Sequence, residues 1–129
     1  MADIVPGNTV RTRYKTGEYV ARFVEERNDK VGIVEILAVL RHPTQGDLHQ
    51  PNEVNVPLFH QRKALAHHEK AVVQLASLVP FDGQVPDYRA SLREALDLEK
   101  EKLRGRDDTW SEKALNNLND LESDYFPTN

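Results

Sequence analysis

The chain has 129 residues, a formal net charge of −4, a hydrophobic fraction of 39% and a charged fraction of 29%. This length suits one domain with its own core, and a net negative chain without a block of Lys and Arg argues against a nucleic-acid partner. The chain contains no cysteine, which excludes disulfides, thiolate catalysis, cysteine-ligated zinc and lipid attached to cysteine.

Targeting signals are also missing from the hydropathy pattern. Residues 1–17 lack the continuous apolar stretch of a signal peptide, and no later segment approaches membrane-spanning length. We therefore expect a cytoplasmic protein that is not a lipoprotein and has no direct membrane insertion. Any association with the periphery of a membrane would depend on a protein partner.

The first two thirds of the chain has the pattern of short antiparallel strands. Residues 8–15 alternate with a period of two, which predicts a strand with one half-buried face. Thr16 and Gly17 are expected to form the next hairpin turn, with Gly17 at positive φ. Residues 18–27 return as a second strand. Its buried face is predicted to consist of Tyr19, Ala21 and Phe23.

Further strands are predicted before the chain becomes helical. Residues 30–42 are almost continuously apolar and β-branched, which predicts a long strand buried on both faces, with Gly32 as a bulge or bend. Residues 62–73 predict one or two short strands, and residues 74–81 predict a 3₁₀-like turn followed by a strand. In the strand-like run, the neighbours His67 and His68 would point to opposite faces.

The last third of the chain predicts two helices in an antiparallel hairpin. The first begins near Tyr88 and ends at Gly105, and Thr109 and Glu112 have the spacing of a capping box that opens the second. The apolar positions gather on one face of each helix. These positions are Leu92, Ala95, Leu96 and Leu103, then Trp110, Ala114, Leu118, Leu121 and Tyr125.

Together these elements predict an α+β fold. Residues 1–84 are expected to form a small SH3-like antiparallel β-barrel or bent sheet, and residues 85–129 a C-terminal antiparallel helical hairpin packed on it as one compact unit.

The segment "RHPTQGDLHQPNEV", residues 41–54, is the richest in chemically active side chains. His42, Asp47 and His49 offer nitrogen and oxygen ligands, but no spacing brings three such groups to one point, so we expect no metal and no cofactor. The chain also lacks a nucleophile elbow and a phosphate-binding glycine loop. These absences predict a protein that is not an enzyme.

Four stretches resemble the kinase-associated protein B (KapB) family of spore-forming bacteria. They are "YKTGEYV" at 14–20, "AVLRHPTQGDLHQP" at 38–51, "VPLFHQRKALAHHEK" at 56–70 and "VPDYRASLREAL" at 85–96. The resemblance covers nearly the whole chain in the same order. It implies a non-enzymatic regulatory protein of the sporulation phosphorelay, an accessory factor for activation or expression of a membrane sensor histidine kinase. The partner would be that kinase or another phosphorelay component.

The loop that carries part of this resemblance is the candidate recognition surface. Its side chains either contact a protein partner or brace the loop internally, and both alternatives stay open. The residues concerned are Arg41, His42, Gln45, Asp47, His49 and Arg62. Leu58 and Phe59 are expected in the core. The alternative function is a small-ligand, metal or RNA binding module on a small β-barrel.

Overall fold

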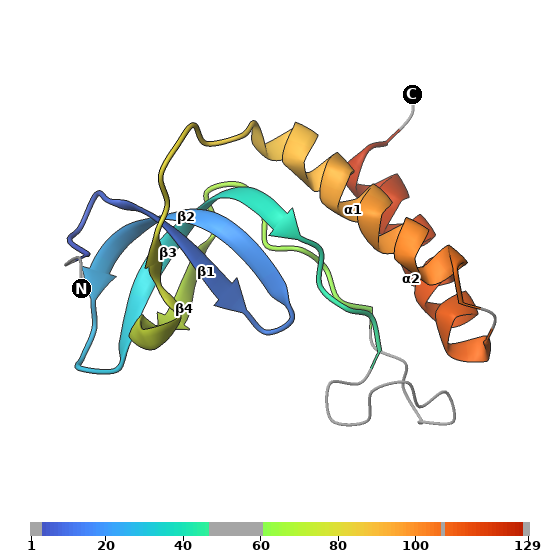
Figure 1. The fold of residues 1–129 in the computed structure, drawn as a ribbon, viewed down its shortest axis with the longest axis horizontal. Helices are drawn as coiled ribbons and strands as arrows, with labels where there is room; N and C mark the ends of the chain where they lie inside the picture. Colours follow the sequence, from blue (N-terminus) through green and yellow to red (C-terminus); the bar gives the residue numbers. More distant parts are fainter. Residues whose placement is uncertain (1–3, 47–60, 107, 128–129) are drawn as a thin grey trace.

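The structure is a computed structural model, and it describes residues 4–46, 61–106 and 108–127. Five antiparallel strands form one sheet in the order β4-β3-β2-β1-β5, followed by two helices at one end of the sheet (Figure 1). The strands are β1 (Thr9–Tyr14), β2 (Gly17–Glu26), β3 (Val31–Arg41), β4 (Lys70–Gln74) and β5 (Val79–Pro80), the helices α1 (Tyr88–Arg104) and α2 (Thr109–Tyr125). The expected α+β fold is confirmed.

The sheet is bent because the pairing of its two longest strands is irregular. The register between β2 and β3 shifts at three places, and such shifts bend a strand and increase its twist. The bend buries both faces of the middle of β2, where Tyr19, Val20 and Ala21 are at most 1% exposed. The predicted buried face of this strand is therefore confirmed, and a second buried face is added to it.

The hairpin turn between β1 and β2 lies one residue earlier than predicted. Tyr14 pairs directly with Gly17, so the turn consists of Lys15 and Thr16, and Lys15 takes the positive φ of 55°. Gly17 is needed for space, because a Cβ there would lie 2.6 Å from the Tyr19 hydroxyl oxygen. The prediction that Gly17 supplies the positive φ is wrong.

Gly32 also has a steric role and does not form the predicted bulge. The register shift near it lies on the partner strand, between Phe23 and Glu25, while Gly32 pairs in register with Glu26. A Cβ at Gly32 would lie 2.8 Å from Cε1 of Phe23. The glycine therefore makes room for an aromatic ring that packs on the sheet.

The run at residues 62–73 is a strand only in its last part, which is β4. His67 and His68 form a turn before it, with His68 at a φ of 70°, and their rings stack at 3.7 Å between centroids. The expected opposite orientation of the two side chains is wrong. The 3₁₀ turn and strand predicted at residues 74–81 are confirmed as η1 (Leu75–Ser77) and β5.

Both helices begin at an aspartate that caps their first turn. Asp87 accepts a hydrogen bond from the Ala90 N–H at 2.9 Å, and Asp108 accepts one from the Ser111 N–H at 2.7 Å. Thr109 is therefore the first helical residue of α2, and the predicted capping box at Thr109 is wrong, because the preceding carboxylate already satisfies the free N–H group. The main-chain bond from Ser111 lowers the pKa of Asp108.

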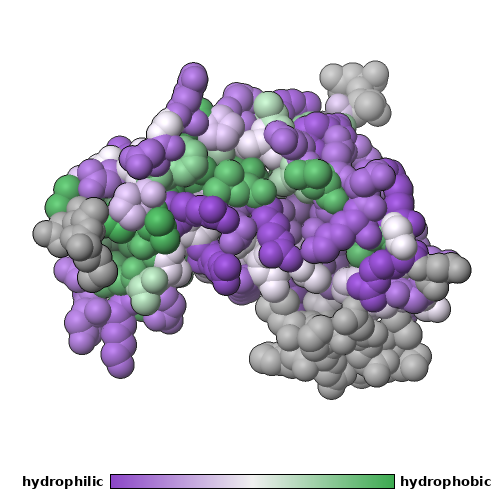
Figure 2. All heavy atoms as spheres, viewed as in Figure 1, coloured by the Kyte–Doolittle hydropathy of each residue, from purple (hydrophilic) through white to green (hydrophobic). Residues whose placement is uncertain are grey.

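The apolar side chains form two adjoining core clusters. One lies between the sheet and the first half of α1, and the other lies between α1 and α2, around Leu96, Trp110 and Leu118. Hydrophobic atoms gather over the sheet and beside α1, whereas the visible face of the helical hairpin is mainly hydrophilic (Figure 2). The predicted apolar faces of both helices are confirmed.

Polar contacts fix the hairpin relative to the sheet. The Val39 N–H of β3 donates to the Ser91 hydroxyl of α1 at 3.0 Å, where the irregular pairing of β3 leaves that N–H free. Between the helices, Glu122 accepts from Lys100 at 2.5 Å and also pairs with Arg93. The hydrogen bond from Lys100 and, to a smaller extent, that from Arg93 lower the pKa of Glu122.

Candidate functional site

The six residues predicted for partner contact do not share one exposed surface. Arg41, the last residue of β3, is exposed and Arg62 is half-buried. His42 and Gln45 are buried, with 0% and 3% of their surfaces exposed. The other two, and the expected core residues of the same segment, lie outside the described residues: Asp47, His49, Leu58 and Phe59.

The Gln45 side chain joins the segment that follows β3 to the segment that leads to β4. Its amide nitrogen donates to the carbonyl of Arg62 at 2.8 Å and to that of Pro43 at 3.1 Å. Its amide oxygen accepts from the Arg62 N–H at 2.8 Å. Arg62 Nε in turn donates to the carbonyl of Gly46 at 3.1 Å. Gln45 therefore bonds to the Arg62 main chain as a neighbouring strand would, and these two residues brace the segments internally.

His42 makes a second internal link, to the end of α2. Its Nδ1 lies 3.0 Å from the carbonyl of Pro43, and its Nε2 lies 2.9 Å from the hydroxyl of Tyr125. The carbonyl of Pro43 can only accept, so Nδ1 carries a hydrogen, and in the neutral ring Nε2 then accepts from the Tyr125 hydroxyl. Burial lowers the pKa of His42 to about 4, which keeps the ring neutral near pH 7.

Three tyrosine hydroxyls hold the main chain at Ala64 and Leu65. The Tyr125 hydroxyl accepts from the Ala64 N–H at 2.8 Å, and the Tyr19 hydroxyl accepts from the Leu65 N–H at 3.2 Å. The Tyr88 hydroxyl donates to the Leu65 carbonyl at 2.6 Å. The tyrosines come from α2, β2 and α1, so this short irregular segment is tied to all three elements.

Sequence reasoning missed these tyrosines as polar groups. Tyr19 and Tyr125 were assigned to apolar faces, where a phenylalanine would pack as well, and only the hydroxyl distinguishes them. A buried tyrosine hydroxyl usually has a hydrogen-bond partner, and this is the one signal in the sequence that points to such a role. Burial raises the pKa of Tyr19 and of Tyr125 to about 12, and it also raises the pKa of Tyr88.

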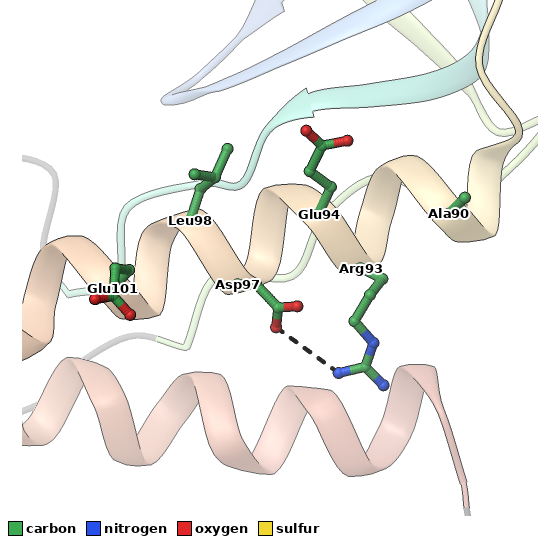
Figure 3. A pocket seen from close by; sticks show the side chains of 6 residues that line it. All are labelled: Ala90, Arg93, Glu94, Asp97, Leu98 and Glu101. Atoms are coloured by element: carbon green, nitrogen blue, oxygen red, sulfur yellow. Dashed lines mark ion pairs between the residues drawn. The ribbon is translucent and has the colours of Figure 1, made fainter.

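The outer face of α1 carries a shallow depression of about 450 Å³ (Figure 3). Leu98 and Glu94 point away from α2 there, while Arg93 and Asp97 lie on the side of α2 and pair at 3.9 Å. The Arg93 guanidinium also lies 3.9 Å over the ring of Phe126. Because its one cation is already committed to neighbours, this depression is a weak candidate for a binding site.

The exposed histidines sit in a separate cluster. His68 Nδ1 lies 2.7 Å from Glu35, which also pairs with Arg22, and the His67 ring stacks on Tyr88 at 5.1 Å. The hydrogen bond from Arg22 and, to a smaller extent, that from His68 lower the pKa of Glu35. Within the described ranges, no group of three or more His, Asp or Glu side chains is placed to hold a metal ion. Since Asp47 and His49 lie outside those ranges, the prediction of no metal stays untested.

The protein is thus of the α+β class, with a bent antiparallel sheet and a C-terminal helical hairpin that are joined through a network of buried polar side chains. The model of the KapB family, which is described as "Kinase associated protein B", matches residues 14–126 of this chain. The chain belongs to the kinase-associated protein B family, and the resemblance seen in the sequence is confirmed.

Two relatives are similar over nearly their whole length. The "Kinase-associated lipoprotein B" of Bacillus subtilis (strain 168) is 42% identical over 126 residues, which are 98% of each chain. The crystal structure of kinase-associated protein B from Bacillus cereus matches with a TM-score of 0.79 at 30% identity, over 97% of this chain and 98% of the other. Their names connect this family to a kinase.

The name of the Bacillus subtilis relative corrects one prediction. We expected a cytoplasmic protein that is not a lipoprotein, and a relative of this similarity is named a lipoprotein. The expectation is wrong as stated, because it was built on the absence of a cysteine and of a signal segment, and such absences do not decide how a protein associates with a membrane. In the part of the chain that the structure describes, no helix has both the length and the apolar composition needed to cross a bilayer.

Proposed function

We propose that this protein is a non-enzymatic accessory factor of a sensor histidine kinase in the sporulation phosphorelay, and that it acts by protein–protein interaction. Membership of a family named for its association with a kinase supports the kinase as the partner. The observation that carries the proposal is that His42 and Gln45, two of the polar side chains predicted for partner contact, form hydrogen bonds within the protein. His42 and Gln45 hold two chain segments in place, and the exposed residues beside them are presented on a fixed main chain.

The state of His42 supports a role without catalysis. Its two ring nitrogens contact the carbonyl of Pro43 and the hydroxyl of Tyr125, and none of its surface is exposed. A general acid or base must come within hydrogen-bond reach of the reacting group, and this ring is turned to the protein on both sides. No contact among the described residues favours the alternative of a small-ligand, metal or RNA binding module on a small β-barrel.

The exposed side chains around the braced segments are suited to contact a partner. Arg41 is the last residue of β3, and Gln61 and Lys63 flank Arg62, whose main chain is held by Gln45; all three are exposed. Their main chain is fixed before binding, so less conformational entropy is lost when a partner binds. Arginine is also enriched at protein interfaces.

The test compares two triple variants of matched composition. One replaces Arg41, Gln61 and Lys63 by Ala, and the control replaces Arg27, Gln74 and Lys30, which are exposed elsewhere on the sheet and its turns. Each gene replaces that of the 42% identical relative in Bacillus subtilis, and heat-resistant spores are counted. In parallel, binding of each purified protein to the cytoplasmic part of a sporulation histidine kinase and the autophosphorylation of that kinase are measured.

We expect the wild type and the control variant to support sporulation and to bind the kinase, and the first variant to lose at least tenfold in kinase binding. Wild-type protein that neither binds the kinase nor changes its autophosphorylation contradicts the proposal. Turnover of ATP by the purified protein alone contradicts its non-enzymatic part.

A further inference from the structure

A pocket of about 260 Å³ lies between the β1–β2 turn and the braced segments. Its lining includes Lys15 and Thr16 of the turn, Pro43 after β3, and Arg62 and Lys63 before β4. The two sides are joined, because the Thr44 N–H donates to the Thr16 hydroxyl at 2.9 Å. The pocket is therefore a feature of the folded chain in which three distant segments meet.

The charge of this pocket is opposite to that of the chain. Among the residues that the structure describes, its lining contains three cationic residues and no Asp or Glu, although the chain as a whole has 21 acidic and 17 basic residues. Neighbouring cations are neutralised: Arg11 and Arg13 on β1 both pair with Glu18. Lys15 and Lys63 are exposed, and neither pairs with an acid within the ranges that the structure describes. Within the described part of the chain, positive charge that no carboxylate neutralises is thus concentrated at one concave place.

Two of the residues that line the pocket, Thr16 and Tyr19, carry hydroxyl groups. The Tyr19 hydroxyl accepts from the Leu65 N–H at 3.2 Å, and the Thr16 hydroxyl accepts from the Thr44 N–H, so each can still donate its own proton. A tyrosine hydroxyl keeps its proton at neutral pH, and burial raises the pKa of Tyr19 further, to about 12. Donors and cations together suit an anionic group.

The size of the pocket limits what this anion belongs to. Sites for drug-sized ligands and cofactors usually occupy roughly 300–1,000 Å³, and 260 Å³ lies below that range. A group of the size of one or two amino-acid side chains matches this volume. The walls are held in advance by the Gln45–Arg62 and Tyr19–Leu65 hydrogen bonds, so the pocket is formed before a ligand arrives.

We propose that this pocket, between the β1–β2 turn and residues 61–65, binds a carboxylate side chain in an acidic segment of the partner protein. Lys15 and Lys63 provide the charge, and the Tyr19 and Thr16 hydroxyls orient the carboxylate. The proposal rests on the proposed function, because it supplies the chemistry by which the partner kinase is recognised.

Fluorescence anisotropy with a labelled peptide tests the pocket without the kinase. The probe is a ten-residue peptide with four Glu residues, and the same peptide with four Gln residues is its neutral counterpart. The pocket variant is Lys15→Gln with Lys63→Gln, and the control variant is Lys30→Gln with Lys70→Gln, which removes equal charge from exposed positions outside the pocket lining. Thermal unfolding of both variants establishes that they are folded.

We expect the Glu peptide to bind wild type and control alike, at least tenfold more tightly than the Gln peptide, and the pocket variant to lose at least tenfold in affinity. Equal losses in the two variants mean attraction by net charge alone and overturn the proposal, as does equal binding of the Gln peptide. A phosphoserine peptide that binds more than tenfold tighter than the Glu peptide would overturn the carboxylate assignment in favour of a phosphoryl group.

The kinase-binding assay separates failure of this inference from failure of the proposed function. If the pocket variant loses the Glu peptide but binds the kinase as the wild type does, the pocket is not the kinase contact and the proposed function stands. If wild type binds the Glu peptide but no kinase, the proposed function fails, and with it the assignment of the kinase as the ligand's source.

Discussion

The hydroxyl of Tyr125, the last residue of α2, lies 2.9 Å from Nε2 of His42, the residue that follows β3. The same hydroxyl accepts from the Ala64 N–H at 2.8 Å. One oxygen atom therefore joins the end of the helical hairpin to both segments that connect β3 with β4. The stability of the loop region and the position of the hairpin should depend on each other through this contact.

Tyr125→Phe should destabilise the protein by about 1–3 kcal/mol, because a buried N–H and a buried ring nitrogen then lose their partner. The measurement is the free energy of unfolding in urea. Tyr14→Phe is the matched control, since the Tyr14 hydroxyl makes no hydrogen bond within the described ranges, and its change should stay within about 0.5 kcal/mol. Equal small effects of the two changes would show that the Tyr125 hydroxyl contributes nothing.

The stability of the protein should fall as the pH falls from about 6.5 to about 4. The pKa of His42 is about 4 in the folded protein and 6.5 ordinarily, so the unfolded chain binds the proton first and acid favours unfolding. Each pKa unit corresponds to about 1.4 kcal/mol, so the loss reaches roughly 3 kcal/mol once the pH is below 4. Above pH 6.5 this contribution is fully present.

The control for this pH dependence is His42→Gln, which cannot titrate. Between pH 6.5 and 4.5, the free energy of unfolding of the wild type should fall with pH much more steeply than that of this variant. Glu99 acts in the opposite direction, because burial raises its pKa and acid then favours the folded state, and it is common to both proteins. Parallel curves for wild type and variant in that interval would show that His42 titrates normally.

Trp110→Ala should destabilise the protein by about 3–5 kcal/mol, because it removes a large side chain from the cluster between the helices. Trp110 is 7% exposed and packs with Leu96 and Leu118. Leu98→Ala is the control on the same helical hairpin, since Leu98 is 61% exposed and should change the stability by less than about 0.5 kcal/mol. An unchanged melting temperature for Trp110→Ala would mean that α2 is only loosely attached.

Gln45→Ala should destabilise the protein by about 1–3 kcal/mol, because the N–H and the carbonyl of Arg62 both lose a partner. Gln84→Ala, at an exposed position, is the control and should be neutral. The affinity of the folded variant for the kinase should also fall, because Gln45 no longer holds the main chain at Arg62 in place. If Gln45→Ala leaves stability unchanged but abolishes kinase binding, Gln45 is a direct contact and its placement inside the protein is wrong.

Elements with a local signal could be predicted from the sequence. Alternation in residues 8–27 and the 3.6-residue spacing of Leu92, Leu96 and Leu103 depend only on the side-chain periods of strands and helices, and both are confirmed. The quoted motifs were sufficient for the family as well. The exact positions of the hairpin turn and of the second helix cap were predicted one or two residues too late, and the structure places them at Lys15 and Asp108. Neighbouring residues have similar turn and cap propensities, so the sequence does not separate them.

Which polar side chains face inward depends on contacts between distant parts of the chain. From the sequence, Gln45 and His42 could equally be exposed recognition residues or internal braces. Their contacts with Arg62 and Tyr125 become visible only in the folded structure. These partners are 17 and 83 residues apart along the chain. A hydrogen bond between buried groups depends on where the whole fold brings them, and main-chain groups such as those of Arg62 and Ala64 are the same in every sequence.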